Sequence, residues 1–298
     1  VLFRSGSYNN FFGFCAGKFN TEGNKNVFIG SFAGNANTTG GCNVYIGPNA
    51  GDRNTLGGRN IALGFYAGRG CSGSTGCYNT FLGYYTGNRI TTGNHNIAIG
   101  ATAGQYLSFG SYNIAFGCSA GKGTTTGCHN IYMGRQSGSA SPTGVNNIFF
   151  GRYSGLRNTT GCYNIFAGSC AGLCNTTGIN NIFIGCNAGC NVTFGNCNTV
   201  IGSVQTANAT VTHTVMIGAG TCERLKINNS GLYVNGTLAN TAGAALTTEK
   251  NFLVVDACAV TSTGCHNTFI GQNAGRYTTF GDRKSTRLNS SHIPLSRM

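Results

Sequence analysis

A short apolar run between an asparagine and a glycine returns along most of the chain. The glycines that close this N-x-x-x-G pattern run from Gly13 to Gly202, and ten of their eleven spacings are seventeen residues. The exception, from Gly64 to Gly83, is nineteen residues. The enclosed residues are mostly Ile, Val, Phe, Tyr and Leu, which favour strands, and no helical period is present. The pattern therefore predicts one short β-strand in every repeat.

Two more glycines keep a fixed position in the repeat. One follows the closing glycine by four residues, and another recurs six residues later. Glycine adopts positive φ without steric cost and allows two backbones to approach closely. We therefore expect each repeat to contain a strand, a tight corner, a second extended piece and another corner. The glycines assigned to these corners include Gly30, Gly34, Gly47, Gly51, Gly100, Gly104, Gly185 and Gly189.

Repeats of this length are too short for two packed helices, and they favour one architecture. An all-β parallel β-solenoid, or β-roll, closes one coil per repeat and stacks each coil on the last. Neighbouring strands in such a stack lie about 4.8 Å apart. Coils of seventeen residues, repeated about twelve times, would then form a rod on the order of 55 Å long.

An asparagine stands four residues before the closing glycine in every copy of the repeat. At the same corner of each coil, its amide can donate to the coil on one side and accept from the coil on the other. Such asparagine ladders stabilise stacked parallel strands. We therefore predict a structural ladder, with a row of polar ligand-binding groups as the alternative. Its members are Asn26, Asn43, Asn60, Asn79, Asn96, Asn113, Asn130, Asn147, Asn164, Asn181 and Asn198.

Both faces of the predicted strand are apolar. In N-I-F-I-G the first and third apolar residues point one way and the middle residue points the other way. The outer residues, such as Ile182 and Ile184, are mainly aliphatic and are expected to fill the coil. The middle residues, such as Phe28 and Phe183, would then form an outward stripe, and strands with two apolar faces are covered on both. We expect further copies of the chain to cover this stripe in a parallel homotrimer.

The repeat pattern divides the chain into segments. The β-solenoid repeats occupy residues 6–202, and the repeat resumes in residues 257–281. Between them, residues 203–256 contain a degenerate coil, T-V-M-I-G, which has lost its asparagine. The same segment contains N-N-S-G between two apolar runs, a signal that predicts a β-hairpin.

The two ends of the chain differ from the rest. Residues 1–5, VLFRS, and residues 282–298, DRKSTRLNSSHIPLSRM, resemble a translated sequencing adaptor. We therefore expect the natural protein to have other termini, and we exclude both ends from the fold. They contain five basic residues and one acidic residue, so the net charge falls from +13 to +9 without them.

Composition and charge narrow the classes of partner. Only 8% of the residues are charged, against about 25% in ordinary soluble domains. The remaining basic residues are scattered singly rather than clustered in a stripe, so we expect no nucleic-acid partner. The sequence has no apolar run of the roughly eighteen residues that a membrane helix needs, so we expect no membrane insertion.

Residues that carry catalytic or metal chemistry do not recur with the repeat. Only five carboxylates lie outside the two ends, and acid–base catalysis needs placed carboxylates. No G-x-S-x-G, phosphate-binding loop or H-E-x-x-H motif occurs. We therefore expect no enzyme, no catalytic site, no metal site and no cofactor.

The 15 cysteines leave three interpretations open. Their thiols are small apolar fillers of a ladder, disulfide partners between coils or chains, or ligands of a metal. Four of them stand six residues before a closing glycine, namely Cys77, Cys128, Cys162 and Cys265. Another four cluster in two neighbouring coils, namely Cys170, Cys174, Cys186 and Cys190.

Three segments carry a resemblance to known families. N-I-A-I-G-A-T-A-G at 96–104 and N-I-F-I-G-C-N-A-G at 181–189 resemble repeats in the head domains of trimeric autotransporter adhesins. Those heads are left-handed parallel β-rolls that trimerise, and similar Gly- and Asn-rich repeats occur in bacteriophage tail fibres. The segment CERLKINNSGLYVNGT at 222–237 is similar to an E-R-L-R-I-x-x-S-G segment of phage tail-fibre proteins. The repeat resemblance covers residues 9–202 and 267–281.

The resemblance implies a structural and adhesive role. We expect a phage tail-fibre shaft involved in host attachment, located on a virion tail or an extracellular surface. Its partners would be further copies of itself and a cell-surface glycan or protein receptor. One alternative is the head of a bacterial trimeric surface adhesin. Another is an ice- or surface-binding β-solenoid, for which the signal is the recurrence of Thr-Thr pairs at 38–39, 91–92, 159–160 and 176–177.

Overall fold

The computed structural model describes residues 6–205, 209–219 and 222–234, together with the backbone of four short strands further along the chain. The chain divides after Arg224 into two compact units, and each is described by itself. The predicted end segment 1–5 lies outside the described residues, as does most of the sequence after residue 238, including most of segments 257–281 and 282–298.

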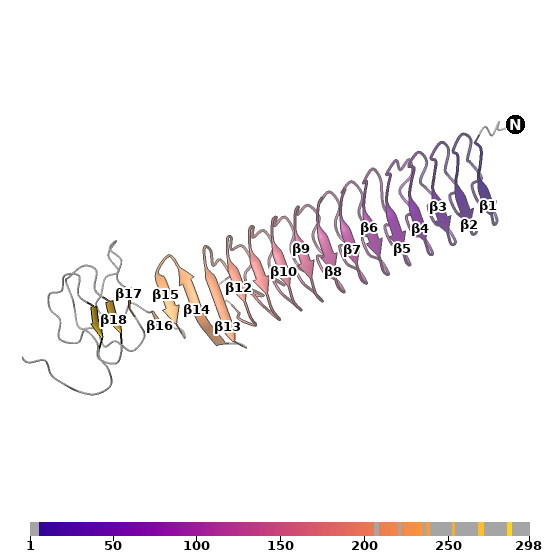
Figure 1. The fold of residues 1–298 in the computed structure, drawn as a ribbon. Coiled ribbons are helices and arrows are strands. Elements are labelled where there is room, and N and C mark those ends of the chain that lie inside the picture. Colours follow the sequence, from indigo (N-terminus) through magenta and orange to yellow (C-terminus); the bar gives the residue numbers. More distant parts are fainter. Residues whose placement is uncertain are drawn as a thin grey trace, which may run out of the picture. The chain divides into compact units, whose positions relative to one another are not determined.

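The first unit is a stack of coils, and each coil contributes one short strand (Figure 1). The first twelve strands have three residues each, and the thirteenth has five. They are β1 (Asn10–Phe12), β2 (Val27–Ile29), β3 (Val44–Ile46), β4 (Ile61–Leu63), β5 (Thr80–Leu82), β6 (Ile97–Ile99), β7 (Ile114–Phe116), β8 (Ile131–Met133), β9 (Ile148–Phe150), β10 (Ile165–Ala167), β11 (Ile182–Ile184), β12 (Thr199–Ile201) and β13 (Val215–Ala219).

Each strand pairs in parallel with the strand of the next coil (Figure 1). Val27 pairs with Val44, seventeen residues further along the chain. In the longer coil Ile61 pairs with Thr80, nineteen residues further along, so the two extra residues leave the register of the strands unchanged. The predicted parallel β-solenoid with coils of about seventeen residues is confirmed.

The return leg of each coil, which runs from the closing glycine to the next ladder asparagine, contains turns rather than the predicted second extended piece. Hydrogen bonds still join it to the next coil. The amide of Gly34 donates to the carbonyl of Ala50 at 2.8 Å, and the amide of Ala36 donates to the carbonyl of Asp52 at 2.9 Å. Within the coil, the amide of Asn37 donates to the carbonyl of Gly34 at 3.0 Å. The leg is therefore held both by its own turns and by its neighbours.

The middle residue of each strand lies inside the coil, so the prediction that it points outward was wrong. Phe28 and Phe183 are fully buried. Their rings stack on those of neighbouring coils, as Phe166 does on Phe183 with 4.9 Å between ring centroids. The outer residues that were expected to fill the coil lie on its outside, where Ile182 is 36% and Ile184 is 43% exposed.

The small residues of the return leg explain this orientation. A Cβ added at Gly34 would lie 2.5 Å from the ring of Phe28, so the glycine backbone rests against the ring. One large ring and one small return leg together fill the narrow interior at the density of a protein core. Where the middle residue is Ala98, the side chain of Leu107 occupies the corresponding space beside Gly104.

The corners combine glycines with larger residues that also have positive φ. All eight corner glycines named from the sequence have φ between 53° and 129°. One larger residue of positive φ precedes the ladder asparagine, such as His95 at 56°, and one follows the closing glycine by two residues, such as Tyr66 at 56°. Bulky residues rarely adopt this conformation, so the hydrogen bonds of the stack hold them in it.

The second unit begins within β14 (Cys222–Asn228). β14 pairs antiparallel with β15 (Gly231–Val234), and Asn228 faces Gly231 across the turn at the N-N-S-G signal. The ammonium of Lys226 lies over the ring of its cross-strand partner Tyr233, 4.9 Å from the centroid. The remaining strands are β16 (Thr237–Leu238), which pairs antiparallel with β15, and β17 (Phe252–Leu253), β18 (Thr268–Ile270) and β19 (Ser285–Arg287), which form a parallel sheet.

A matched pair of glycine substitutions tests how closely the return leg rests on the ring. Gly34→Ala places a methyl group 2.5 Å from the Phe28 ring at a φ of 55°, and we expect the free energy of unfolding to fall by roughly 3 kcal/mol. Gly73→Ala has a φ of 80° but meets no atom within 4 Å, so only the backbone term of about 1 kcal/mol applies. Urea unfolding followed by circular dichroism measures both, and equal losses would contradict the packing described.

Two buried tyrosines at the middle strand position differ in their hydrogen bonding. The hydroxyl of Tyr45 accepts a hydrogen bond from Nδ2 of Asn54 at 2.6 Å. The hydroxyl of Tyr132 is buried without a hydrogen bond of good geometry, although the side chains of Ser141 and Thr124 lie near enough to lower its pKa against the larger effect of burial. Burial raises the pKa of Tyr132 from 10.0 to about 12, and burial likewise raises the pKa of Tyr45. Both hydroxyls therefore stay neutral in the folded state over a pH range in which the same tyrosines ionise in the unfolded chain.

Conversion of these tyrosines to phenylalanine separates the two environments. Tyr132→Phe removes an unpaired buried hydroxyl, so we expect the free energy of unfolding at pH 7 to rise by about 1 kcal/mol. Tyr45→Phe leaves the Asn54 amide without this partner, so we expect a fall of about 1 kcal/mol. Because burial raises the pKa of Tyr132 in the folded state, the pH-dependent contribution of this group to the free energy of unfolding is fully present below pH 10. It is lost as the pH rises toward about 12. Tyr132→Phe should therefore lose less stability than the wild type over that range, and identical alkaline profiles would contradict this.

Candidate functional site

The predicted ladder asparagines stand above one another at the corner that precedes each strand. Each of the eleven donates its backbone N–H to Oδ1 of the ladder asparagine in the preceding coil, as Asn130 does to Asn113 at 3.1 Å. Nδ2 of Asn130 also donates to that oxygen, at 3.0 Å, and to the carbonyl of Gly144 at 2.7 Å. The Oδ1 atom of Asn130 in turn accepts from the backbone N–H and Nδ2 of Asn147 at 3.0 and 3.1 Å.

This asparagine ladder is continuous through the irregular parts of the stack. Across the longer coil, the backbone N–H of Asn79 still donates to Oδ1 of Asn60 at 2.9 Å. At the degenerate coil Thr214 stands at the ladder position, and its backbone N–H donates to Oδ1 of Asn198 at 3.1 Å. All eleven ladder asparagines are buried. The ladder therefore holds the coils together and does not present its amides to a ligand.

A second row of buried asparagines was missed from the sequence. Asn37 and Asn175 stand three residues before the third glycine of their coils, in the recurring N-T-T-G motif. Nδ2 of Asn37 donates to Oδ1 of Asn20 at 2.6 Å, and Nδ2 of Asn175 donates to Oδ1 of Asn158 at 2.8 Å. The fixed distance between asparagine and glycine was the available signal. Because these side chains are fully buried, the Asn-x-Thr sequences at Asn37 and Asn158 are not accessible to modification in the folded chain.

The outer residues of the strands form the apolar strand face, which runs along the whole first unit. No charged residue occupies a first or third strand position from β1 to β13, and the polar residues there are Asn10, Thr80 and Thr199. The exposed large side chains on this face are Phe12, Ile29, Ile46, Ile61, Ile97, Ile114, Phe116, Met133, Ile148, Phe150, Ile165, Ile182, Ile184, Ile201, Val215 and Ile217. A continuous apolar surface of this kind is a candidate interaction site.

In the recurring Thr-Thr pairs, some of the threonine hydroxyls form hydrogen bonds within the stack of coils. The hydroxyl of Thr38 donates to the carbonyl of Thr55 at 3.1 Å, and that of Thr159 donates to the carbonyl of Thr176 at 3.0 Å. The first threonine of these pairs therefore bonds the next coil rather than ordering water on a flat surface. This geometry does not favour the ice-binding alternative.

The titratable residues do not assemble into a metal site within the part of the chain that the structure describes. There, no three His, Cys, Asp or Glu side chains come together in a way that could hold a metal ion. Thirteen cysteines are described and all carry free thiols. In the cluster of four, burial is the main cause that raises the pKa of Cys190, and the neighbouring Cys174 thiol adds to it. No helix among the described residues has the length and apolar character needed to cross a membrane.

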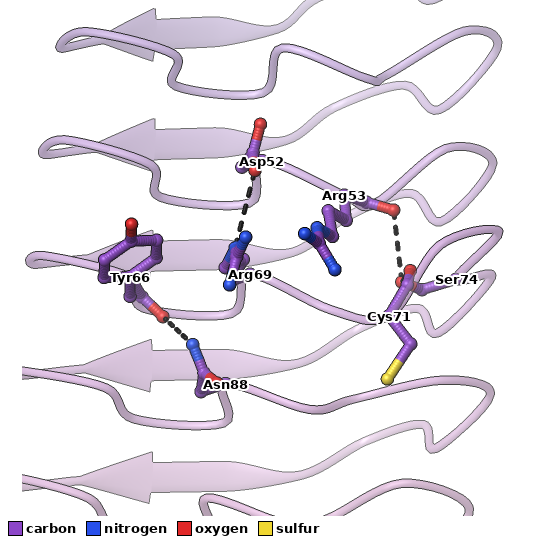
Figure 2. Close-up of polar contacts among 7 residues, drawn as sticks. All are labelled: Asp52, Arg53, Tyr66, Arg69, Cys71, Ser74 and Asn88. Carbon is purple, nitrogen blue, oxygen red and sulfur yellow. Dashed lines mark hydrogen bonds and ion pairs between the residues drawn. The ribbon is translucent and has the colours of Figure 1, made fainter.

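Polar side chains of the longer coil and its neighbours lie along the return legs, some of them beside Tyr66 (Figure 2). Tyr66 lies at the corner where β4 ends, and Asp52 and Arg69 lie beside it on the return legs of successive coils. Nε of Arg69 is 3.5 Å from Oδ2 of Asp52, and the guanidinium lies over the Tyr66 ring, 4.7 Å from its centroid. Nδ2 of Asn88 donates to the carbonyl of Tyr66 at 3.4 Å. The polar side chains of the return leg therefore adjoin the aromatic residues of the corner.

Four aromatic residues form the corner cluster, defined here as Phe65, Tyr66, Tyr84 and Tyr85. The rings of Tyr66 and Tyr85 lie 4.9 Å apart, and those of Phe65 and Tyr84 stack at 5.7 Å. Tyr84 is 55% exposed. Exposed tyrosine combines apolar contact area with a polar tip, so the cluster is suited to binding a partner.

The ladder can be tested with a substitution inside it and one beside it. Asn130→Ala removes the side-chain bonds to Asn113, Gly144 and Asn147 but keeps the backbone bond to Asn113. We expect the free energy of unfolding to fall by roughly 3 kcal/mol, since several buried groups lose partners. The control is Asn146→His, because Asn146 is exposed and His129 stands at the same position in the preceding coil. Urea unfolding followed by circular dichroism compares the two, and a change below about 1 kcal/mol for Asn130→Ala would contradict the ladder's structural role.

Known proteins give no independent indication of function. No protein-family model, curated protein or solved structure matches the chain. The stacked coils, the apolar strand face and the corner cluster are therefore the observations on which a functional proposal rests.

Proposed function

We propose that the stacked coils form the shaft of a homotrimeric fibre of the phage tail-fibre type, which takes part in attachment to a host surface. The observation that carries the proposal is the apolar strand face, which is free of charge over thirteen strands. In this proposal the protein is structural and adhesive rather than enzymatic, and it acts on a virion tail or an extracellular surface.

The size of the apolar strand face supports burial against other chains. Thirteen strands at about 4.8 Å spacing span roughly 58 Å, and strands of three residues are about 10 Å wide. The resulting area of roughly 600 Å² lies at the upper end of the apolar patches that monomers expose. It approaches the roughly 800 Å² that each partner buries in a standard interface. A second and a third copy of the chain are therefore suitable partners.

The regular spacing of the face supports a parallel arrangement of identical chains. Every coil presents its outer residues at the same step along the stack, so an identical chain in parallel matches that step over its whole length. Closed symmetry then limits the assembly to a small number of copies, and the resemblance to trimerising β-rolls supports three. The trimeric head of a bacterial surface adhesin has the same requirements and remains the alternative owner of such a shaft.

Light scattering behind size exclusion tests the assembly with the full chain of 30.9 kDa. We expect a mass three times that of the chain. Ile114→Asp combined with Ile148→Asp places two charges in the apolar strand face, and we expect at least a tenfold weaker association, since buried unpaired charges cost several kcal/mol. Phe109→Asp is the control, because Phe109 is exposed in a corner outside the strands. A folded wild-type monomer at all concentrations would refute the trimer.

A further inference from the structure

At the corner that follows each strand, the side chains change abruptly from large to small between one coil and the next along the stack. The residues directly after the closing glycine lie above one another, because the amide of Thr102 donates to the carbonyl of Tyr84 at 2.8 Å and the amide of Ser119 donates to the carbonyl of Ala101 at 2.9 Å. Along this row the side chains are Phe65, Tyr84, Ala101, Cys118 and Arg135. Two coils with small residues therefore separate Tyr84 from the next large side chain.

Tyr84 presents an open ring face at this step. One face stacks on Phe65 of the preceding coil, with 5.7 Å between centroids and 11° between planes. The ring of Tyr85 supports it from the side at 4.5 Å. Tyr84 is 55% exposed, and the equivalent position in the following coil holds only the small side chain of Ala101. The ring is thus both fixed by its neighbours and accessible.

The two coils that have small side chains at this corner also carry hydroxyl groups there. We define the corner notch as Tyr84, Ala101, Thr102, Cys118 and Ser119. Ala101 and Cys118 are exposed, and Thr102 and Ser119 are half-buried. The hydroxyl oxygens of Thr102 and Ser119 lie 2.8 Å apart in one hydrogen bond, and the Ser119 hydroxyl also lies 3.9 Å from the thiol of Cys118. One hydroxyl donates its proton to the other, and both oxygens retain acceptor capacity.

At the far side of the corner notch, Arg135 directs its guanidinium toward the coil beyond. Its guanidinium lies over the ring of Tyr153, in the coil beyond, 5.8 Å from the centroid. From Tyr84 to Arg135 the row advances three steps of about 4.8 Å, or roughly 14 Å. This length accommodates one or two sugar rings.

We propose that the corner notch binds a hexopyranose ring of a cell-surface glycan. A hexopyranose has an apolar face of C–H groups that stacks on an aromatic ring, here Tyr84, and a periphery of hydroxyls that bond to Thr102 and Ser119. A few placed polar groups beside an aromatic surface are typical of small-ligand sites. The inference deepens the proposed attachment function by naming the ligand class and the residues, and it rests on that function only for the biological role of the contact.

A sugar fits the dimensions of the corner notch better than a protein partner does. Protein interfaces bury roughly 800 Å² on each partner, whereas the small side chains here extend over only two coils. Single-ring contacts are weak, and several copies of the notch on one assembly would raise the overall affinity through multivalency. A fibre of three parallel chains would present the corner notch three times.

Saturation-transfer NMR on the full chain with methyl glycosides of glucose, galactose, mannose and N-acetylglucosamine tests the proposal. We expect transfer to the ring C–H protons of at least one of these sugars. Tyr84→Ala removes the platform, and Ala101→Tyr extends the stacked row and covers it, so each should weaken binding about tenfold or more. Tyr84→Phe keeps the platform and Tyr163→Ala removes an exposed tyrosine elsewhere, so both should bind within about threefold of wild type.

The outcomes distinguish this site from the proposed assembly. Binding that survives Ala101→Tyr, or the absence of transfer to every sugar by a chain that assembles as a trimer, would overturn the glycan site and leave the fibre proposal standing. Sugar binding by a monomeric chain would support the site and refute the trimer. Attachment to periodate-treated cells that is lost with Ala101→Tyr would overturn the glycan in favour of a protein partner.

Discussion

Every coil is hydrogen-bonded in register to the coil before it, and the remaining features of the first unit depend on this one constraint. A fixed repeat places like residues above like residues, so that the buried asparagines bond in a row and the rings of Phe149 and Phe166 stack at 4.8 Å. The same register aligns the outer strand residues into one apolar face. The longer coil keeps this register because Asn54 still bridges to Ser74 in the coil that carries the two extra residues.

The period, the corner glycines and the asparagine row were predictable because the same residue type recurs at the same position of each repeat. The orientation of the strand was not, because alternation separates two faces but does not say which is inside when both are apolar. The deciding contact lies between Phe28 and the return leg at Gly34, and only a large ring opposite a missing side chain fills the interior. Positive φ at residues such as His95 and Tyr66 was also outside prediction, because composition indicates that conformation for glycine alone.

The corner cluster and the corner notch could not be recognised before the register was known. Phe65 and Tyr84 are nineteen residues apart in the sequence, and neither carries a motif. Once the coils are aligned, the cluster follows from which residues share the corner row. The open face of Tyr84 depends equally on the small size of Ala101, a property of the neighbouring repeat rather than of the tyrosine itself.

The pairing of each coil with only its two neighbours has a consequence for how such a gene can change. Loss or gain of one whole repeat by recombination between similar DNA segments would join two coils that already match in register, and the buried rows would continue across the junction. The stack would become shorter or longer by about 4.8 Å for each repeat. The distance that the fibre extends from its attachment point would then change in small heritable increments. Surfaces such as the corner notch would keep their structure.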